Sequence, residues 1–275
     1  MRIVRALVAF VVGLVVVAVV DVSPARAAVP GLQIVSAVTV ADSVSPKSAV
    51  ATCPAGKRVI GTGVYLDGVA GDVVVDDLVP TASTVVATGY ERGGGTAAVW
   101  WIRAFAVCAS PLPGLTIVTT TTPATSAHKT GTAACPTGTQ VLGAGAAING
   151  GLGGVTLDAL WPDTASVTAA AFEDAFATTA DWTLTTHAIC AQAPPGLVRV
   201  TAGAVGATTA ATSPACPAGT ATLGLGWDIS SRYGGRILVE TAMPTAGAAQ
   251  VGARVTDAAV TPGWVLAARA VCAVP

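Results

Sequence analysis

The sequence predicts an all-β protein made of three homologous antiparallel units of about 82 residues, each closed by one disulfide. Three observations lead to this fold class. A set of landmarks recurs three times at nearly constant spacing, and the six cysteines fall into the units as pairs. The β-branched residues valine and threonine are abundant whereas lysine, glutamate and leucine are scarce, which favours strands over helices. No segment after the first 27 residues shows apolar residues at helical spacing.

The repeat is the strongest signal in the chain. Each unit contains Pro-Gly-Leu, then Cys-Pro-x-Gly, then Gly-x-Gly, then an acid four residues before a proline, and finally a tryptophan eight residues before the second cysteine. The Gly-x-Gly motifs begin at Gly61, Gly143 and Gly224, and the prolines that follow the acids are Pro80, Pro162 and Pro244. Landmarks at fixed offsets indicate true repeats, which divide the chain into residues 28–110, 111–192 and 193–275.

The N-terminus has the features of an export signal over residues 1–27. Two arginines precede an uninterrupted apolar run from Ala6 to Val20, and Ala25-Arg26-Ala27 suits signal peptidase. The apolar run is shorter than the roughly 20 residues of a membrane-spanning helix. We therefore expect cleavage after Ala27 and secretion of the remainder, with retention as an uncleaved anchor as the alternative. No other segment is apolar enough to span a bilayer, so the cleaved protein is expected to have no membrane span.

The repeat also decides the cysteine pairing. Six cysteines allow 15 connectivities, but only one gives every unit the same internal bond. That pairing is Cys53–Cys108, Cys135–Cys190 and Cys216–Cys272. Zinc sites need closely spaced ligands, and these cysteines are isolated, so we predict disulfides and no metal site. Each bond should stabilise its unit by roughly 4 kcal/mol.

Alternation in the last strand of each unit separates an inner from an outer face. In the first unit Trp100, Ile102 and Ala104 share the apolar face that ends on Cys108. The opposite face differs between units, and His187 lies on it in the second, where we expect it to be exposed. The other strands expected in the first unit are Leu32–Val40, Ala49–Cys53, Arg58–Leu66, Val73–Leu78 and Thr84–Tyr90, with equivalents in the later units.

Glycine weakens a strand unless another group approaches closely, so Gly-x-Gly needs an explanation. We hypothesise that the recurring tryptophans, Trp100, Trp182 and Trp264, cover these glycines as core residues. A phosphate cradle is the weaker interpretation, because a dinucleotide fingerprint needs a third glycine and a following helix.

Two architectures fit the repeat. Three β-sandwich-like units follow one another in tandem, or the three units pack round a pseudo-threefold axis as one body. The cysteine separation resembles that of immunoglobulin sandwiches, although the tryptophan lies elsewhere. The Cys-Pro-x-Gly opening of three similar β units resembles the threefold prism of the egg vitelline-membrane outer-layer proteins, whose units are shorter. Neither resemblance covers enough of the chain to assign a family. Because each unit has its own disulfide, we favour the tandem arrangement.

Composition and motifs exclude several function classes. With 14 basic and 15 acidic residues and no basic cluster, the chain is not expected to bind nucleic acid. The two histidines, His128 and His187, do not recur, the cysteines are committed to disulfides, and no nucleophile motif is present. We therefore predict no catalytic residues, no cofactor and no enzyme activity. A secreted hydrolase with two carboxylates is the least favoured alternative.

The recurring acid is the most distinctive polar feature. Asp76, Asp158 and Glu240 occupy one position of the unit, at the end of an apolar strand. Our preferred interpretation is a turn acid that accepts backbone N–H bonds. The alternative is one ligand contact per unit, to a sugar hydroxyl or to calcium. Calcium needs several oxygens around one point, and only the first unit has such a cluster.

Two functional hypotheses remain from different classes. The first is a secreted binding or adhesion module for an extracellular glycan or protein, which uses the loops Asp67–Asp72, Asn149–Gly154 and Asp228–Arg236. Trp101, Arg103 and Phe105, on the outer face of the first unit's last strand, are further candidate binding residues. The second is a structural protein of the envelope or matrix without a small ligand, which Thr-rich stretches such as Thr119–Thr122 favour.

Overall fold

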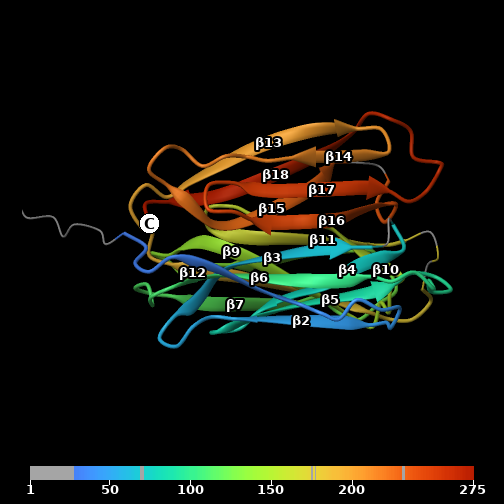
Figure 1. The fold of residues 1–275 in the computed structure, drawn as a ribbon, viewed down its shortest axis with the longest axis horizontal. Coiled ribbons are helices and arrows are strands. Elements are labelled where there is room, and N and C mark those ends of the chain that lie inside the picture. The colour runs from blue at the N-terminus through green and yellow to red at the C-terminus, as the bar shows by residue number, and fades with distance from the viewer. Residues whose placement is uncertain (1–27, 69–70, 175, 177, 231–232) are drawn as a thin grey trace, which may run out of the picture.

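The computed structural model describes residues 28–68, 71–174, 176, 178–230 and 233–275. Within them, eighteen strands form three antiparallel sheets of six strands each, which confirms the predicted all-β class (Figure 1). The predicted signal peptide, residues 1–27, lies outside the described residues.

The strands follow the same order in each repeat and run along the long axis of the body (Figure 1). The first repeat contains β1 (Gln33–Val38), β2 (Lys47–Thr52), β3 (Arg58–Asp67), β4 (Val73–Pro80), β5 (Thr84–Glu91) and β6 (Trp101–Ala109). The second contains β7 (Thr116–Thr121), β8 (Lys129–Ala134), β9 (Gln140–Asn149), β10 (Val155–Pro162), β11 (Ser166–Glu173) and β12 (Thr183–Ala191). The third contains β13 (Val198–Gly206), β14 (Thr209–Thr212), β15 (Ala221–Ser230), β16 (Ile237–Pro244), β17 (Ala249–Val255) and β18 (Trp264–Ala273). The predicted strands of the first repeat agree with these bounds to within a residue or two.

Every sheet is shared by two repeats. Sheet I has the order β1-β6-β3-β16-β17-β14, sheet II the order β2-β5-β4-β9-β12-β7, and sheet III the order β13-β18-β15-β10-β11-β8. Each repeat thus gives three strands to one sheet and three to the next, and the third repeat returns to the first. The three units form one pseudo-threefold body, so the tandem arrangement that we favoured is wrong.

The repeats meet through short pairings at the middle of each sheet. Only two residue pairs join β3 to β16, and the same is true of β4 with β9 and of β10 with β15. The larger of two apolar clusters runs through all three repeats and includes the recurring tryptophans Trp100, Trp182 and Trp264, which are at most 3% exposed. The inner face predicted for the last strand is confirmed, because Ile102, Ala104 and their equivalents are fully buried.

The three predicted disulfides are all present, and no free cysteine lies among the described residues. Cys53 follows β2 of sheet II, whereas its partner Cys108 lies in β6 of sheet I. The bond therefore ties two neighbouring sheets together inside one repeat. This is why a disulfide within each repeat is compatible with repeats that share their sheets.

The Gly-x-Gly motifs lie where the three repeats meet, and the tryptophan hypothesis for them is wrong. A Cβ on Gly143 would overlap the carbonyl oxygen of Ile60 and lie 2.7 Å from the Cα of Gly61. The first glycine of each motif likewise faces backbone of the equivalent segment in a neighbouring repeat, so these glycines surround the pseudo-threefold axis. The tryptophans pack elsewhere; Trp100, for example, lies against Gly89.

The second glycine of each motif faces the recurring proline of a neighbouring repeat. A Cβ on Gly145 would lie 2.5 Å from Cδ of Pro80, and Gly63 and Gly226 make the same contact with Pro244 and Pro162. The glycine and the proline that recur in the sequence are thus the two sides of one inter-repeat contact. The sequence indicated a close approach but not the group that makes it.

Candidate functional site

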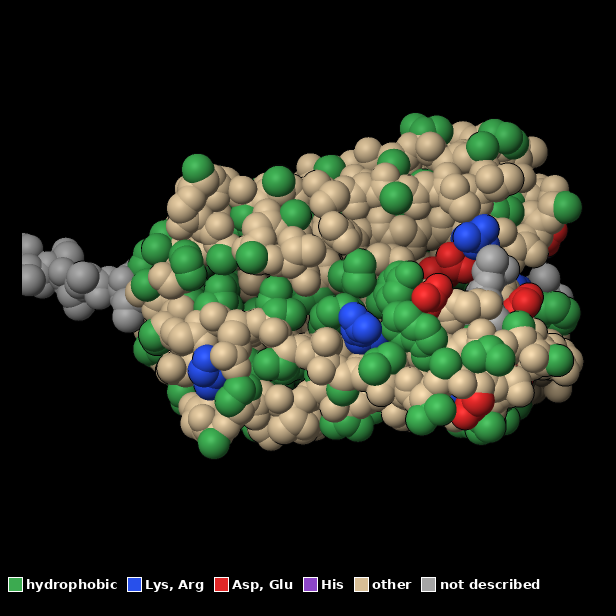
Figure 2. All heavy atoms as spheres, in the orientation of Figure 1, with side chains coloured by type: hydrophobic (Ala, Val, Ile, Leu, Met, Phe, Trp, Pro, Cys, Tyr) green, Lys and Arg blue, Asp and Glu red, His purple; other side chains and the backbone are tan. Residues whose placement is uncertain are grey.

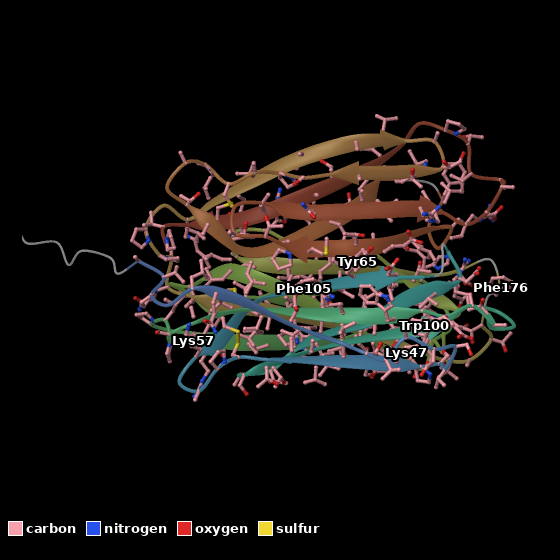
Figure 3. The ribbon with its side chains drawn as sticks, in the orientation of Figure 1. Lys47, Lys57, Tyr65, Trp100, Phe105 and Phe176 are labelled. Carbon is pink, nitrogen blue, oxygen red and sulfur yellow. A yellow bond between two sulfur atoms is a disulfide. The ribbon has the colours of Figure 1, made fainter. Side chains whose placement is uncertain are left out.

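The outer face of sheet I carries a cluster of aromatic side chains at its centre. Trp101, Arg103 and Phe105 project from β6 on the side opposite the core, and all three are half-buried. Strand β3 adds Tyr65, which pairs with Arg103 in the sheet register. We call Tyr65, Trp101, Arg103 and Phe105 the aromatic face. Figure 3 shows Tyr65 and Phe105 near the middle of the molecule in this view.

Three side chains of the aromatic face, those of Tyr65, Trp101 and Arg103, pack on one another. The Tyr65 and Trp101 rings meet edge to face, with centroids 5.3 Å apart. The Arg103 guanidinium lies 5.2 Å from the centroid of the Trp101 ring. Such contacts restrict the rings to one orientation while leaving part of their surface accessible. The face is therefore a preformed apolar platform with a cation beside it.

A hollow of about 330 Å³ adjoins the aromatic face where the first and third repeats meet. Its lining includes Tyr65 and Asp67 from β3, Glu240 and Thr241 from β16, and Arg254 from β17. These residues come together because Tyr65 pairs with Thr241 across the junction. Figure 2 shows acidic and basic side chains gathered beside hydrophobic ones on this side of the molecule.

Ion pairing and backbone contacts hold the charged groups of the hollow in place. Arg254 Nε donates to both carboxylate oxygens of Glu240, at 3.1 and 3.2 Å. The Gly71 amide donates to Glu240 Oε1 at 2.9 Å, and the Gly68 amide donates to Asp67 Oδ1 at 2.9 Å. The hollow thus presents two oriented carboxylates and a guanidinium next to an aromatic ring.

The structure places the three recurring acids differently. Glu240 reaches the hollow beside the aromatic face, whereas Asp76 and Asp158 are buried, each 3% exposed, on sheets II and III. Asp158 accepts hydrogen bonds from Thr156 Oγ1 at 2.6 Å and from the Gly235 amide at 3.0 Å. Asp158 and Glu240 therefore accept backbone N–H bonds from the loop of the next repeat, a contact that the sequence does not reveal.

Burial changes the ionisation of the two buried acids. Desolvation, reinforced by the nearby Asp77 carboxylate, raises the pKa of Asp76 to about 8. Desolvation also raises the pKa of Asp158 to about 7, although its bonds from Thr156 and Gly235 oppose the shift. One oxygen of Asp76 has no hydrogen-bond partner among the described residues. Both carboxyls thus hold a proton in the folded protein at mildly acidic pH.

The free energy of unfolding should fall as pH rises from about 4 to about 8, because the unfolded chain releases the protons of these two acids near pH 4. Between these limits the folded state binds more protons than the unfolded state, so rising pH favours unfolding until both carboxyls ionise. Asp76→Asn replaces the carboxyl by a neutral group of similar shape. In urea unfolding it should be more stable than the wild type at pH 8 and similar to it at pH 4; equal pH slopes for the two proteins would contradict this.

Several other polar residues have structural roles. His187, which we expected to be exposed, is only 8% exposed, and its Nδ1 lies 3.1 Å from Thr119 Oγ1 of the neighbouring strand β7. Arg92 and Asp174 form a buried ion pair at 2.8 Å between the first and second repeats. The two residues occupy equivalent positions of their repeats. Sequence analysis missed this pair because the tandem arrangement that it favoured does not bring these equivalent residues together.

The predicted binding loops lie in part outside the described residues, since residues 69–70 and 231–232 are not described. Among the described residues, no group of His, Cys, Asp and Glu side chains is arranged to hold a metal ion. Those residues also contain no helix long and apolar enough to cross a membrane.

Comparison of the chain with the models of known protein families and with curated proteins finds no match. The fold itself defines the class. The chain is a disulfide-bonded all-β repeat protein whose three disulfides are typical of an oxidising, extracellular environment.

Proposed function

We propose that this protein is a secreted, non-catalytic binding module that holds a glycan on the outer face of sheet I. The observation that carries the proposal is the juxtaposition of the aromatic face with the charged hollow of Asp67, Glu240 and Arg254. The export signal predicted at the N-terminus and the three disulfides support an extracellular location.

The chemistry of a sugar matches both parts of this surface. One side of a pyranose ring presents C–H groups, which pack on the electron-rich face of an aromatic ring. The hydroxyl groups at the ring edge both donate and accept hydrogen bonds. The carboxylates of Asp67 and Glu240 accept from hydroxyl groups, and the Arg254 guanidinium donates to them. Hydrogen bonds to charged groups are stronger than neutral ones, so the hollow supplies specificity beside an apolar platform.

The aromatic face is a departure of one repeat from the common pattern. Trp101, Arg103 and Phe105 are replaced in β12 by Thr183, Thr185 and His187, and in β18 by Val265, Ala267 and Arg269. Sheet II has the same architecture without aromatic side chains at these positions, and sheet III carries a different pair, with the Arg269 guanidinium 4.0 Å from the centroid of the Trp161 ring. The fold therefore does not require the rings, and this supports a binding role over the structural alternative.

The test is a glycan array followed by calorimetry with the glycans that bind. Trp101→Ala should weaken binding at least tenfold, as the loss of an aromatic anchor does, and should change stability by no more than about 0.5 kcal/mol. The matched control is Thr183→Ala, the equivalent position on sheet II, which should bind as the wild type does. If the wild type binds no glycan, the structural envelope or matrix role is favoured instead.

A further inference from the structure

We propose that a second hollow, between the first and second repeats, binds an arginine side chain of a partner protein. The hollow has a volume of about 530 Å³ and lies between the start of β3 and the segment that leads into β7. Its lining is mostly apolar and includes Val59, Ala82, Leu112, Leu115 and Ile117. Arg58 lies at the rim of the hollow and follows Lys57 in the chain. Figure 3 labels Lys57, and the hollow adjoins that end of the body. The site shares no residue with the aromatic face and does not depend on the proposed glycan.

The equivalent place between the second and third repeats is filled by the protein's own Arg199. Arg199 in β13 corresponds to Ile117 in β7: Ile117 pairs with Ile189 of β12, and Arg199 pairs with Val271 of β18, which is the counterpart of Ile189. Both positions are half-buried. The pseudo-threefold symmetry thus allows the hollow to be compared with an equivalent place that an arginine side chain already fills.

The guanidinium of Arg199 binds backbone carbonyl groups. Its Nη2 donates to the Val141 carbonyl at 2.7 Å and to the Thr164 carbonyl at 3.4 Å, and its Nε donates to the Asp163 carbonyl at 3.0 Å. These contacts need a planar group with several donors, which distinguishes arginine from lysine. The alkyl stem of the side chain remains free to pack on apolar neighbours.

The first repeat presents the corresponding carbonyl groups on the same backbone frame. The Val59 amide donates to the Ala82 carbonyl at 3.2 Å, as the Val141 amide donates to Thr164 at 3.0 Å. The turn that precedes β5 also matches, because Thr81 N bonds Thr84 O at 2.7 Å and Asp163 N bonds Ser166 O at 2.8 Å. The carbonyl groups of Val59, Thr81 and Ala82 are therefore placed as those that bind Arg199.

Ile117 leaves this place open because its side chain is short and carries no donor. The apolar lining suits the stem of an incoming arginine, and the carbonyl groups suit its guanidinium. Arg58 is the charged residue at the rim; it is exposed, and its Nη1 donates to the Lys57 carbonyl at 3.1 Å. Its repulsion of a second guanidinium is screened by solvent and salt. An arginine on an exposed segment of another protein is thus the ligand that the hollow fits.

The experiment titrates the full protein with three short blocked peptides, Gly-X-Gly with X as arginine, lysine or norleucine, and follows amide chemical shifts by NMR. We expect the arginine peptide to bind at least tenfold more tightly than the other two, with shifts around Val59, Ala82 and Ile117. Ile117→Arg places an internal guanidinium in the hollow and should abolish these shifts. Equal affinity of the arginine and norleucine peptides, or unchanged binding to Ile117→Arg, would overturn the proposal.

A second variant tests the symmetry argument by gain of a site. Arg199→Ile copies the first junction onto the second and should add one arginine-binding site, with new shifts around Val141 and Thr164. Ile34 occupies the corresponding position at the junction between the third and first repeats. The number of arginine peptides bound per protein is therefore compared with the number that the wild type binds. A folded Arg199→Ile protein that binds no additional arginine peptide would show that the Arg199 contacts do not define the ligand.

Discussion

The first repeat on its own, residues 28–110 with its disulfide formed, is expected not to fold as a monomer. Half of its strands belong to sheet I, which the third repeat completes, and half belong to sheet II, which the second repeat completes. Both apolar clusters of the described residues draw on all three repeats, so an isolated repeat would expose the apolar faces of both half-sheets. One disulfide does not compensate for that loss in a chain of about 80 residues.

Circular dichroism and size-exclusion chromatography of this fragment measure the effect. The matched control is a circular permutant that begins at residue 111 and ends with residues 28–110. It keeps all three repeats, and the two segments that it joins are adjacent, since the Val29 amide donates to the Val274 carbonyl at 3.0 Å. The permutant should fold. A folded monomer of the first repeat would contradict the shared-sheet architecture, whereas a folded trimer of it would agree with that architecture.

Gly143→Ala should destabilise the protein by at least about 3 kcal/mol, at the upper end of the cost of overpacking a core. The added Cβ would overlap the Ile60 carbonyl and press on the Gly61 backbone. Backbone of a neighbouring strand cannot move aside as a flexible side chain can, and the displacement would reach the equivalent contacts around the axis. The midpoint of urea unfolding measures the loss.

Gly247→Ala is the control for this substitution. A Cβ at Gly247 meets nothing within 4 Å, so its stability should remain within about 0.5 kcal/mol of the wild type. Two variants with the same chemical change and opposite surroundings thus separate the cost of contact from that of replacing glycine. If Gly143→Ala were as stable as Gly247→Ala, the close approach at the axis would be wrong.

The alternation of side chains was enough to predict the strands and the inner face of β6. It could not predict which strands of different repeats are neighbours, because each inter-repeat pairing involves only two residue pairs and leaves no periodic signal. Each disulfide, which suggested a self-contained unit, joins two sheets of the shared body. The Gly-x-Gly motif correctly indicated a close approach, but the approaching group belongs to another repeat.

For the candidate site, too, the sequence predicted what depends on a single strand and not what depends on the neighbouring strands. Trp101, Arg103 and Phe105 were found by alternation along one strand, which is local information. Tyr65 and Arg254 were missed because their place beside those residues depends on sheet order. Three acids at one repeat position suggested one role, yet Asp76 and Asp158 are buried whereas Glu240 is partly exposed beside Arg254.

The exchange of strands between repeats also fixes how many repeats close the body. In an open solenoid a repeat contacts only its neighbours, so copies can be added or lost one at a time. Here the third copy returns to the first, and the ring closes only at three. A lineage that passed through one or two copies per chain would have needed several chains to complete the ring, as in cyclic homo-oligomers. The Val29 amide, which donates to the Val274 carbonyl, adds a further contact by which the third copy returns to the first.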